Sequence, residues 1–414
     1  EVSVRLIISV HKFGPLPSME GLRSLLTGLE QLELPEQALF KFAFMVKGSQ
    51  ELERFYRFAH HMKNWAQAAA QDKAASRAYI LLAMGEYGDS SRILRAHIGS
   101  EWTFCGAAGA VAPGQLSLEE LVERYRYRRI SENTTIYGVI GNPIAHSRSP
   151  EIHNPIYEKY AWDAVYLRFR VDDLRAFLAV REWLPIRGIS CTVPHKEALA
   201  QMAISGESAR AGKAVRLLGA ANTLYLRSDG PKSRDWFAEN TDIEGFLRPL
   251  LELCCRNKRS LAGKKAAVIG AGGAARAVVY ALLKEGMLCE IYNRTLGKAE
   301  RLKELFRRDF PIVKVACLEQ GALISADCDL LVQTTSVGMG RDERNPIPAY
   351  RFRSGQIAYD LIYEPPQTAF LRSAEQGGAW VLNGSAMLET QALAQIELFA
   401  DARGTVPLPA GQKT

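Results

Sequence analysis

The stretch AAVIGAGGAARA, residues 266–277, decides how the carboxyl-terminal half of the chain folds. It opens with an apolar run typical of a buried parallel strand, and alanine-rich helical sequence follows the glycines. The intervening spacing GxGGxxxA is a variant of the glycine fingerprint that brings backbone N–H groups to a pyrophosphate at a helix N-terminus. Because a strand, a glycine turn and a helix follow one another at the spacing of this fingerprint, we predict a dinucleotide site. The alternative is a turn whose glycines serve only the backbone conformation. The expected contacts are Gly270, Ala271, Gly272, Gly273 and Ala274.

The residues about twenty positions beyond these glycines predict which dinucleotide is bound. An NAD site places an acidic residue at the end of the second strand, but Glu290 lies too early for that role. The strand ends instead in polar and basic residues that suit a 2′-phosphate, so NADP is favoured. A solvated surface role for Arg294 is the alternative. The candidate 2′-phosphate contacts are Asn293, Arg294, Thr295 and Lys298.

Composition restricts the class of protein. A length of 414 residues suggests about three domains, and 47% apolar with 23% charged residues is typical of a soluble globular protein. No apolar stretch approaches the roughly 20 residues of a membrane span. The net charge of +7 suits an anionic substrate or cofactor. Since the basic runs are short and carry no recognition motif, we expect no nucleic-acid partner.

The seven cysteines and the first residue bear on the cellular compartment. The number is odd and no CxxC pair occurs, so we expect buried free thiols in a reducing compartment and no metal site. No signal-peptide pattern is present. Because the chain starts with Glu1, we expect that upstream residues are missing or were removed. The cytoplasm is the predicted location, with a plastid as the alternative.

The first 120 residues alternate short apolar runs with helical stretches. Strands are expected at 5–11, 39–46, 78–84 and 101–107, and helical stretches at 19–32, 49–70 and 90–98. Runs without polar alternation are typical of parallel strands covered on both faces. About four βα units correspond to half of a (βα)8 barrel, which needs about 250 residues.

Three residues of this region suggest chemistry. Lys41 stands inside the apolar run LFKFAFM, where an ammonium group is costly unless it is paired or has a lowered pKa that makes it a nucleophile. His11 ends the first strand, and Arg92 ends the polar run GEYGDSSR. From these residues alone, Lys41 could equally be a lysine on an edge strand or one that is paired with an acidic residue.

Four polar segments precede the glycine turn. GNPIAHSRSPEIHN carries Ser147 and Ser149, whose hydroxyls could bind a carboxylate or cap a helix. SCTVPHK presents Thr192 and Lys196 together. GAANTL adds the Asn222 amide, and NTDIEG adds the carboxylate of residue 242. Taken singly, each segment could equally be capping or turn chemistry.

In this order and spacing, these segments closely resemble the shikimate dehydrogenase family from Tyr137 to about Phe399, with later matches at 334–339, 360–365 and 387–391. The resemblance implies that Lys196 and Asp242 form the acid/base pair for NADPH-dependent reduction of 3-dehydroshikimate, with a structural salt bridge as the alternative. The implied substrate contacts are Ser147 and Ser149 for the carboxylate, Thr192, Asn222 and Gln391 for ring hydroxyls, and Tyr363. The further implied cofactor contacts are Thr335, Gly338 and Met339.

The first block resembles the second half of type I 3-dehydroquinate dehydratase. The matching positions are His11 and Phe13, Lys41, Gly88 with Ser91 and Arg92, Gly99-Ser100 with Thr103-Phe104, and Pro113-Gly114-Gln115. The resemblance implies that Lys41 forms an imine with the substrate ketone and that His11 moves the proton. It also implies that Arg92 and Gln115 hold the carboxylate and hydroxyls. Because half a barrel cannot close, we expect little dehydratase turnover from these residues alone.

The two resemblances together predict an α/β chain of four parts. Residues 1–129 form the carboxyl-terminal half of a (βα)8 barrel, 130–239 an αβ substrate-binding domain, 240–378 a Rossmann NADP domain, and 379–414 a helix returning to the substrate domain. The predicted function is a bifunctional fusion acting on 3-dehydroquinate, 3-dehydroshikimate and shikimate, with its oligomeric state left open. The alternatives are a catalytically inactive quinate-sensing regulator, an NAD-dependent quinate dehydrogenase and a merely structural α/β protein.

Overall fold

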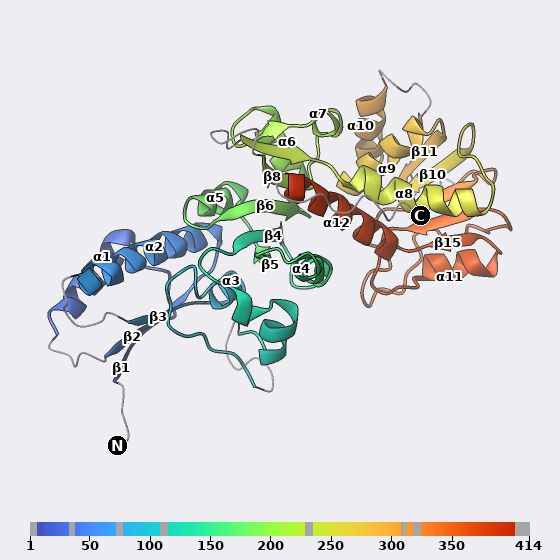
Figure 1. The fold of residues 1–414 in the computed structure, drawn as a ribbon. Helices are drawn as coiled ribbons and strands as arrows, with labels where there is room; N and C mark the ends of the chain where they lie inside the picture. Colours follow the sequence, from blue (N-terminus) through green and yellow to red (C-terminus); the bar gives the residue numbers. More distant parts are fainter. Residues whose placement is uncertain are drawn as a thin grey trace. The chain divides into compact units, whose positions relative to one another are not determined.

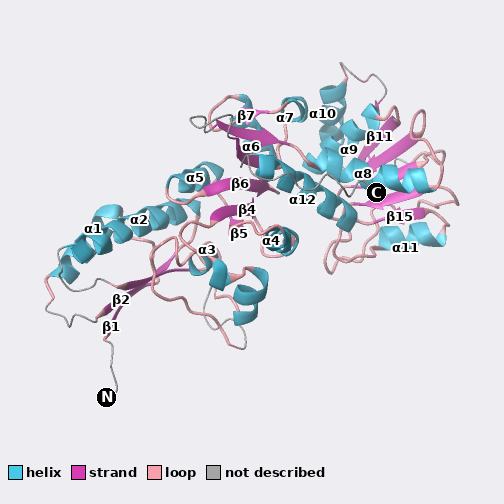
Figure 2. Cartoon of the chain, viewed as in Figure 1, coloured by secondary structure: helices cyan, strands magenta, loops and turns pink. Residues whose placement is uncertain are grey.

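The computed structural model describes residues 6–32, 38–71, 78–107, 115–227, 235–307, 310, 313–317 and 324–401 (Figures 1 and 2). By compactness the chain divides into two units, Glu1–His195 and Lys196–Thr414. The domain boundaries expected from the motifs fall elsewhere, and they stay predictions. Each unit is described by itself below.

The first unit begins with a three-stranded parallel sheet in the order β1-β2-β3. Its elements are β1 (Ile7–Lys12), α1 (Met19–Glu30), β2 (Leu39–Met45), α2 (Ser49–Gln71), β3 (Tyr79–Met84) and α3 (Asp89–Ile93). One face of β2 packs on α2, because Phe42 and Phe44 each meet the Phe58 ring edge to face, at centroid distances of 6.4 and 6.0 Å. Since side chains alternate along a strand, Lys41 lies on the opposite face.

The strand expected at residues 101–107 is absent, so that prediction was wrong. Only an isolated bridge from Gly106 to Ser117 forms there. Side chains bind the carbonyl groups that a strand ladder would use: Arg95 donates to the carbonyls of Ser100 and Glu101 at 3.2 and 3.0 Å. The Ser100 hydroxyl donates to the carbonyl of Trp102 at 3.0 Å. Local side-chain hydrogen bonds of this kind compete with sheet formation.

The remainder of the first unit forms a second parallel group in the order β5-β4-β6. Its elements are η1 (Glu120–Arg124), η2 (Tyr127–Arg129), β4 (Thr135–Gly141), α4 (Ser149–Lys159), β5 (Ala164–Arg170), α5 (Leu174–Ala179), η3 (Val180–Glu182) and β6 (Ile186–Cys191). The strands are buried along nearly their whole length, as expected for parallel strands covered on both faces. The structure thereby places Ser149 at the start of α4 and Thr192 directly after β6.

The second unit opens with short helices and a small group of strands. These elements are α6 (Lys196–Ile204), β7 (Arg210–Ala211), α7 (Lys213–Leu218), β8 (Thr223–Arg227), β9 (Asp235–Glu239) and α8 (Asp242–Arg256). The strand order is β8-β9-β7, with β8 and β9 antiparallel. Lys196 and Asp242 are therefore the first residues of α6 and α8.

A six-stranded parallel sheet forms the rest of the second unit, in the order β12-β11-β10-β13-β14-β15. Its elements are β10 (Lys265–Ile269), α9 (Gly273–Lys284), β11 (Leu288–Asn293), α10 (Leu296–Phe306), β12 (Val313–Cys317), β13 (Leu330–Gln333), β14 (Ile357–Asp360), α11 (Ala369–Gln376), β15 (Trp380–Leu382) and α12 (Gly384–Asp401). This is the 3-2-1-4-5-6 order of the dinucleotide-binding fold, in which the order reverses beside the first strand. The predicted α/β fold with a Rossmann sheet is confirmed.

Alternating residues of β10 explain why the sheet is covered on both faces. Ala266 and Val268 belong to one apolar cluster, which includes Phe246 of α8. Ala267 and Ile269 belong to another, which includes Phe370 of α11. The apolar run read from the sequence therefore reflects a central strand buried on both sides.

No helix in the described part of the chain is long and apolar enough to span a bilayer. The cysteines form no disulfide, and five of the seven are buried. The described residues contain no group of three His, Cys, Asp or Glu side chains arranged to hold a metal.

Candidate active site

The two residues expected to exchange protons form an ion pair in the second unit. Lys196 Nζ lies 2.5 Å from Asp242 Oδ2, and the two side chains are 17% and 4% exposed. Asp242 also stands at the N-terminus of α8, where the helix dipole favours a negative charge. An ammonium group beside a shielded carboxylate can deliver one proton to a substrate oxygen and recover it afterwards.

The Asn222 side chain fixes the carboxylate of Asp242. Its amide nitrogen lies 2.8 Å from Asp242 Oδ1, and its oxygen accepts a hydrogen bond from the Thr241 N–H at 2.8 Å. The Asp242 N–H in turn donates to Asn240 at 3.0 Å. One oxygen of the carboxylate therefore contacts Asn222 and the other contacts Lys196.

Helix α12 brings Gln391 to the same cluster. The Asn222 amide nitrogen lies 3.1 Å from Gln391 Oε1. Gln395, one helical turn further on, lies 3.3 Å from Gln391 Oε1 and donates to the Thr223 hydroxyl at 3.2 Å. Sequence reasoning missed Gln395, although its i,i+4 spacing places it on the same helix face as Gln391.

The glycine turn between β10 and α9 is tightly packed at one glycine and open at the next. Gly270 follows β10 with φ of +118°, and a Cβ atom there would collide with the Thr334 hydroxyl. A Cβ on Gly272 would meet nothing within 4 Å, so the backbone at the start of α9 is open. A Cβ on Gly273 would lie 3.8 Å from Lys196 Cδ. The turn and the acid/base pair are therefore neighbours within this unit.

Arg276 of α9 connects this turn to the helix that starts at Lys196. Its guanidinium group donates to the carbonyls of Leu218 and Gly219 at 3.1 and 3.3 Å. It also forms an ion pair with Glu197 at 2.9 Å. Because Glu197 is adjacent to Lys196, the contact fixes the start of α6 relative to α9.

The predicted 2′-phosphate contacts follow β11, where Arg294, Thr295 and Lys298 are exposed. The Asn293 amide donates to the carbonyl of Thr295 at 2.7 Å and holds this turn. Glu290 is buried and accepts hydrogen bonds from Tyr292 and Ser325, so its carboxylate is already used inside the sheet.

The remaining predicted contacts lie after the carboxyl ends of β13 and β14. Thr335 donates its N–H and its hydroxyl to Gln333, both at 2.9 Å, while Gly338 has φ of +95° and Met339 is 57% exposed. Tyr363 is half-buried three residues beyond β14. Ligands of such folds bind outside the carboxyl ends of the strands, which is where these residues lie.

The two serines of the predicted carboxylate site are adjacent in the first unit. Ser147 Oγ lies 3.2 Å from Ser149 Oγ, and the Ser149 N–H donates to Ser147 Oγ at 3.4 Å. Thr192 is held in the same unit, because its N–H donates to the carbonyl of Ile140 at 2.9 Å.

The candidate dehydratase residues also lie in the first unit. Lys41 Nζ lies 4.3 Å from the centroid of the Phe104 ring, and Arg92, 3% exposed, donates to the Phe104 carbonyl at 3.3 Å. His11 is exposed, but Ser9 pairs with Lys41 in the ladder, so strand alternation places His11 on the same face as Lys41. Gln115 is half-buried beside the short bridge at Ser117, whereas Pro113 and Gly114 lie outside the described residues.

Comparison with known families identifies both halves of the sequence. Residues 1–132 match the family model for type I 3-dehydroquinase, residues 139–224 that for the shikimate dehydrogenase substrate binding domain, and residues 252–338 that for shikimate / quinate 5-dehydrogenase. The predicted resemblance to these families is confirmed.

Individual relatives support the same assignment. The chain is 32% identical over 412 residues to a chloroplastic bifunctional 3-dehydroquinate dehydratase/shikimate dehydrogenase of Arabidopsis thaliana, an alignment covering 95% of this chain and 63% of that protein. It is 37% identical to the NADP(+) shikimate dehydrogenase of Caldanaerobacter subterraneus, covering 64% of this chain and 91% of that enzyme. Shikimate 5-dehydrogenase from Thermus thermophilus, solved with NADP(H) and shikimate, is 32% identical with a TM-score of 0.53, and the match covers 66% of this chain and 95% of that structure.

The Rossmann sheet, the glycine turn and the adjacent Lys–Asp pair are features typical of dinucleotide-dependent α/β oxidoreductases. The chain belongs to the shikimate dehydrogenase family. It spans less than two thirds of the length of its bifunctional relative from Arabidopsis.

Proposed function

We propose that this protein reduces 3-dehydroshikimate to shikimate with NADPH, and that Lys196 and Asp242 supply the proton. The observation that carries the proposal is the 2.5 Å contact between these two side chains, located against the glycine turn. NADPH, when bound, supplies the hydride. Lys196 Nζ gives a proton to the ketone oxygen, and the Asp242 carboxylate stabilises the ammonium form that makes this transfer possible.

The residues present fit the phosphates of NADP. Gly272 leaves open space at the N-terminus of α9, where backbone N–H groups and the helix dipole attract a pyrophosphate. Arg294 and Lys298 provide exposed positive charge after β11, and the carboxylate of Glu290 is buried in the sheet. The turn would therefore hold the pyrophosphate, while the β11 turn would hold the 2′-phosphate.

A second activity is proposed for the first unit, namely dehydration of 3-dehydroquinate through an imine on Lys41. It is supported by the match of residues 1–132 to the type I 3-dehydroquinase family and by the contacts of Lys41 and Arg92 with Phe104. The product of this step, 3-dehydroshikimate, is the substrate of the proposed reductase. The proposed partners of the protein are thus small molecules.

The direct test is an assay of the purified chain with shikimate or quinate as substrate and NADP⁺ or NAD⁺ as cofactor. We expect reduced nucleotide to form fastest with shikimate and NADP⁺. Preference for quinate and NAD⁺ would instead identify a quinate dehydrogenase. Ligand binding without turnover in all four mixtures would identify a regulator and overturn the proposal.

For the cellular location we propose the cytoplasm, with a plastid as the alternative because the Arabidopsis relative is named chloroplastic. Fractionation of the source cells, followed by immunodetection, distinguishes the two.

A further inference from the structure

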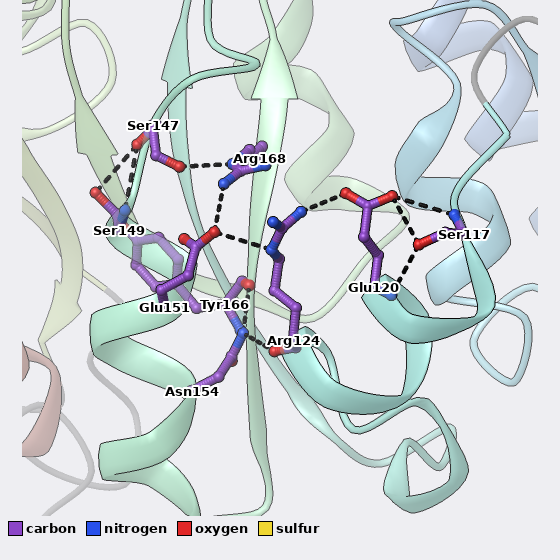
Figure 3. A network of polar contacts seen from close by, with 9 residues as sticks. All are labelled: Ser117, Glu120, Arg124, Ser147, Ser149, Glu151, Asn154, Tyr166 and Arg168. Atoms are coloured by element: carbon purple, nitrogen blue, oxygen red, sulfur yellow. Dashed lines mark hydrogen bonds and ion pairs between the residues drawn. The ribbon is translucent and has the colours of Figure 1, made fainter. Parts of the chain in front are cut away.

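One carboxylate oxygen in the first unit forms ion pairs with two guanidinium groups. Glu151 Oε1 lies 2.9 Å from Arg124 Nε and 2.8 Å from an Arg168 terminal nitrogen (Figure 3). Glu151 belongs to the first turn of α4, directly after the serine loop. Arg124 ends η1, within the region that matches the dehydratase family. The carboxylate therefore links two segments that sequence analysis assigned to different activities.

Arg168 carries this link to the serine loop. While one of its nitrogens contacts Glu151, its Nε donates to the backbone carbonyl of Ser147 at 2.7 Å. The Ser147 N–H donates to the carbonyl of Ile144, so the backbone of Ser147 is held on both sides. Its hydroxyl donates to the Ser149 hydroxyl at 3.2 Å.

Arg124 is held in turn by the segment that follows Gln115. Its guanidinium group forms an ion pair with Glu120, and Glu120 accepts a hydrogen bond from the Ser117 N–H at 3.1 Å. Burial alone would raise the pKa of Glu120, but the Ser117 N–H and Arg124 lower it overall, so this carboxylate stays ionised. Figure 3 shows the resulting continuous chain of contacts from Ser117 to Ser147.

A second set of bonds reaches Ser149 from the same place. The Asn154 amide donates to the Arg124 carbonyl and to the Tyr166 carbonyl, both at 3.0 Å, and its oxygen accepts from the Tyr166 N–H at 2.7 Å. The buried Tyr166 hydroxyl bonds to Ser190 and Ser149. The Arg124 side chain therefore leads to Ser147 through ion pairs, whereas the hydrogen bonds that reach Ser149 start from the Arg124 backbone carbonyl.

We propose that Arg124 and Glu151 are positioning residues for the anion-binding serines of the dehydrogenase. The inference rests on the proposed function, which assigns the substrate carboxylate to Ser147 and Ser149. A site ordered before binding loses less free energy when the ligand arrives, so its disorder raises KM rather than lowering kcat. The dehydratase-like segment thereby contributes to substrate affinity in the reductase.

Helix α4 offers a matched control. Glu158, at its other end, also pairs with two arginines of the connecting segment, Arg126 at 2.7 Å and Arg129 at 2.9 Å. These pairs resemble those of Glu151 in charge and in the segments joined, but within the described part of the chain the contacts of Glu158 do not lead to the serine loop. Glu151→Gln and Glu158→Gln therefore make the same chemical change in similar ion pairs. Of the two carboxylates, only Glu151 is connected to the two serines through residues that the structure describes.

In the full chain we expect Glu151→Gln to raise the KM for shikimate about 2- to 30-fold, the range for mutations along a network of contacts that leads to a site. The kcat and the KM for NADP⁺ should stay within about twofold. Arg124→Met should act in the same direction, and Glu158→Gln should change nothing. In a Ser147→Ala background, Glu151→Gln should add little, because coupled residues are not additive. An unchanged KM, or full additivity with Ser147→Ala, would overturn the proposal.

Amide hydrogen exchange of residues 142–149 tests the same inference without enzyme activity. We expect faster exchange of this loop in Glu151→Gln and Arg124→Met, and wild-type exchange in Glu158→Gln. If the wild type lacked shikimate activity but the loop still loosened, the proposed function would fail and the positioning would stand. Unchanged exchange in both variants would contradict the positioning itself.

Discussion

A Cβ atom placed on Gly245 would lie 2.6 Å from the Cβ atom of Gln391. The absence of a side chain at this first-turn position of α8 allows α12 to approach closely. That approach brings Gln391 Oε1 to 3.1 Å from Asn222, whose amide also holds Asp242. The glycine of the NTDIEG segment thus sets the distance between the acid/base pair and the helix that completes the cluster.

We expect Gly245→Ala to force the two helices apart. Overpacking of a tight contact costs about 1–3 kcal/mol of stability, and displacement of Gln391 should raise the KM for shikimate. Gly297→Ala in α10 is the control, because a methyl group there meets nothing closer than 3.9 Å. It should be neutral or slightly stabilising, as alanine favours a helix over glycine. Thermal unfolding and steady-state kinetics check both variants, and wild-type behaviour of Gly245→Ala would refute the packing argument.

We expect Lys196→Ala and Asp242→Asn to lower kcat for shikimate oxidation by about 10²- to 10⁴-fold, the range for general acid–base groups. Nucleotide binding, followed by fluorescence titration, should be retained in both variants. Lys213→Ala, another lysine that begins a helix, should leave kcat unchanged. Losses below tenfold in both variants would exclude the pair from proton transfer and leave it as a structural salt bridge.

We expect Arg294→Asp to weaken discrimination in favour of NADP⁺. A charge-assisted hydrogen bond contributes about 1.5–3 kcal/mol, so the NADP⁺/NAD⁺ ratio of kcat/KM should fall about 10- to 100-fold. The introduced carboxylate could also accept from ribose hydroxyls. Arg301→Asp, with the same charge change further along α10, should leave the ratio unaltered. An unchanged ratio in Arg294→Asp would place the 2′-phosphate elsewhere.

The parts of the fold that the sequence predicted are those with a local signal. Residues 266–277 contain an apolar strand, a glycine turn and the start of a helix. Each of these features can be recognised from a few consecutive residues. Residues 101–107 gave a misleading signal, because their apolar content suggested a strand. Arg95 and Ser100 precede this segment, and their side chains donate hydrogen bonds to the carbonyls of Ser100 and Trp102. The apolar pattern of residues 101–107 gives no indication of these bonds.

The residues of the candidate site could be predicted only where they belong to a motif of a known family. Lys196 and Asp242 are far apart in sequence, and neither periodicity nor composition pairs them, so their contact was expected only from the family resemblance. Glu151 and Arg168 were missed, because an ion pair between a helix and a strand leaves no repeating pattern. Gln395 was missed although its helical spacing from Gln391 was visible.

We expect borohydride, added together with 3-dehydroquinate, to reduce an imine on Lys41 and leave a covalent adduct. Peptide mass mapping should locate the adduct on Lys41, and Lys41→Ala should abolish it. Lys47, just beyond β2, provides the control, and Lys47→Ala should keep the adduct.

For a protein of these 414 residues we expect little or no dehydratase turnover. The described strands β1–β3 form an open three-stranded sheet, and His11 is exposed. An adduct on another lysine would contradict the assignment of Lys41, and rapid turnover would contradict the argument from the open sheet.

Asp360, at the end of β14, should make the second unit less stable as the pH rises from about 4 to 6. Burial raises the pKa of this carboxyl to about 6, against the opposing effect of hydrogen bonds from the Thr368 hydroxyl and the Ile362 N–H. Between the unfolded and folded pKa values, the folded state binds more protons than the unfolded state, so the free energy of unfolding falls with increasing pH. At about 1.4 kcal/mol per pKa unit, the loss is on the order of 3 kcal/mol and is complete near pH 7.

Asp360→Asn cannot titrate, so its free energy of unfolding relative to the wild type should increase by up to about 3 kcal/mol between pH 4 and pH 7. Asp342→Asn is the control, because Arg344 lowers the pKa of Asp342 and its titration falls below this range. The difference between that variant and the wild type should therefore stay flat from about pH 5 to pH 7. Denaturant unfolding across this range measures both differences. A flat difference for Asp360→Asn would show that the buried carboxyl keeps an ordinary pKa, whereas a difference that decreases with pH would show that its hydrogen bonds outweigh burial.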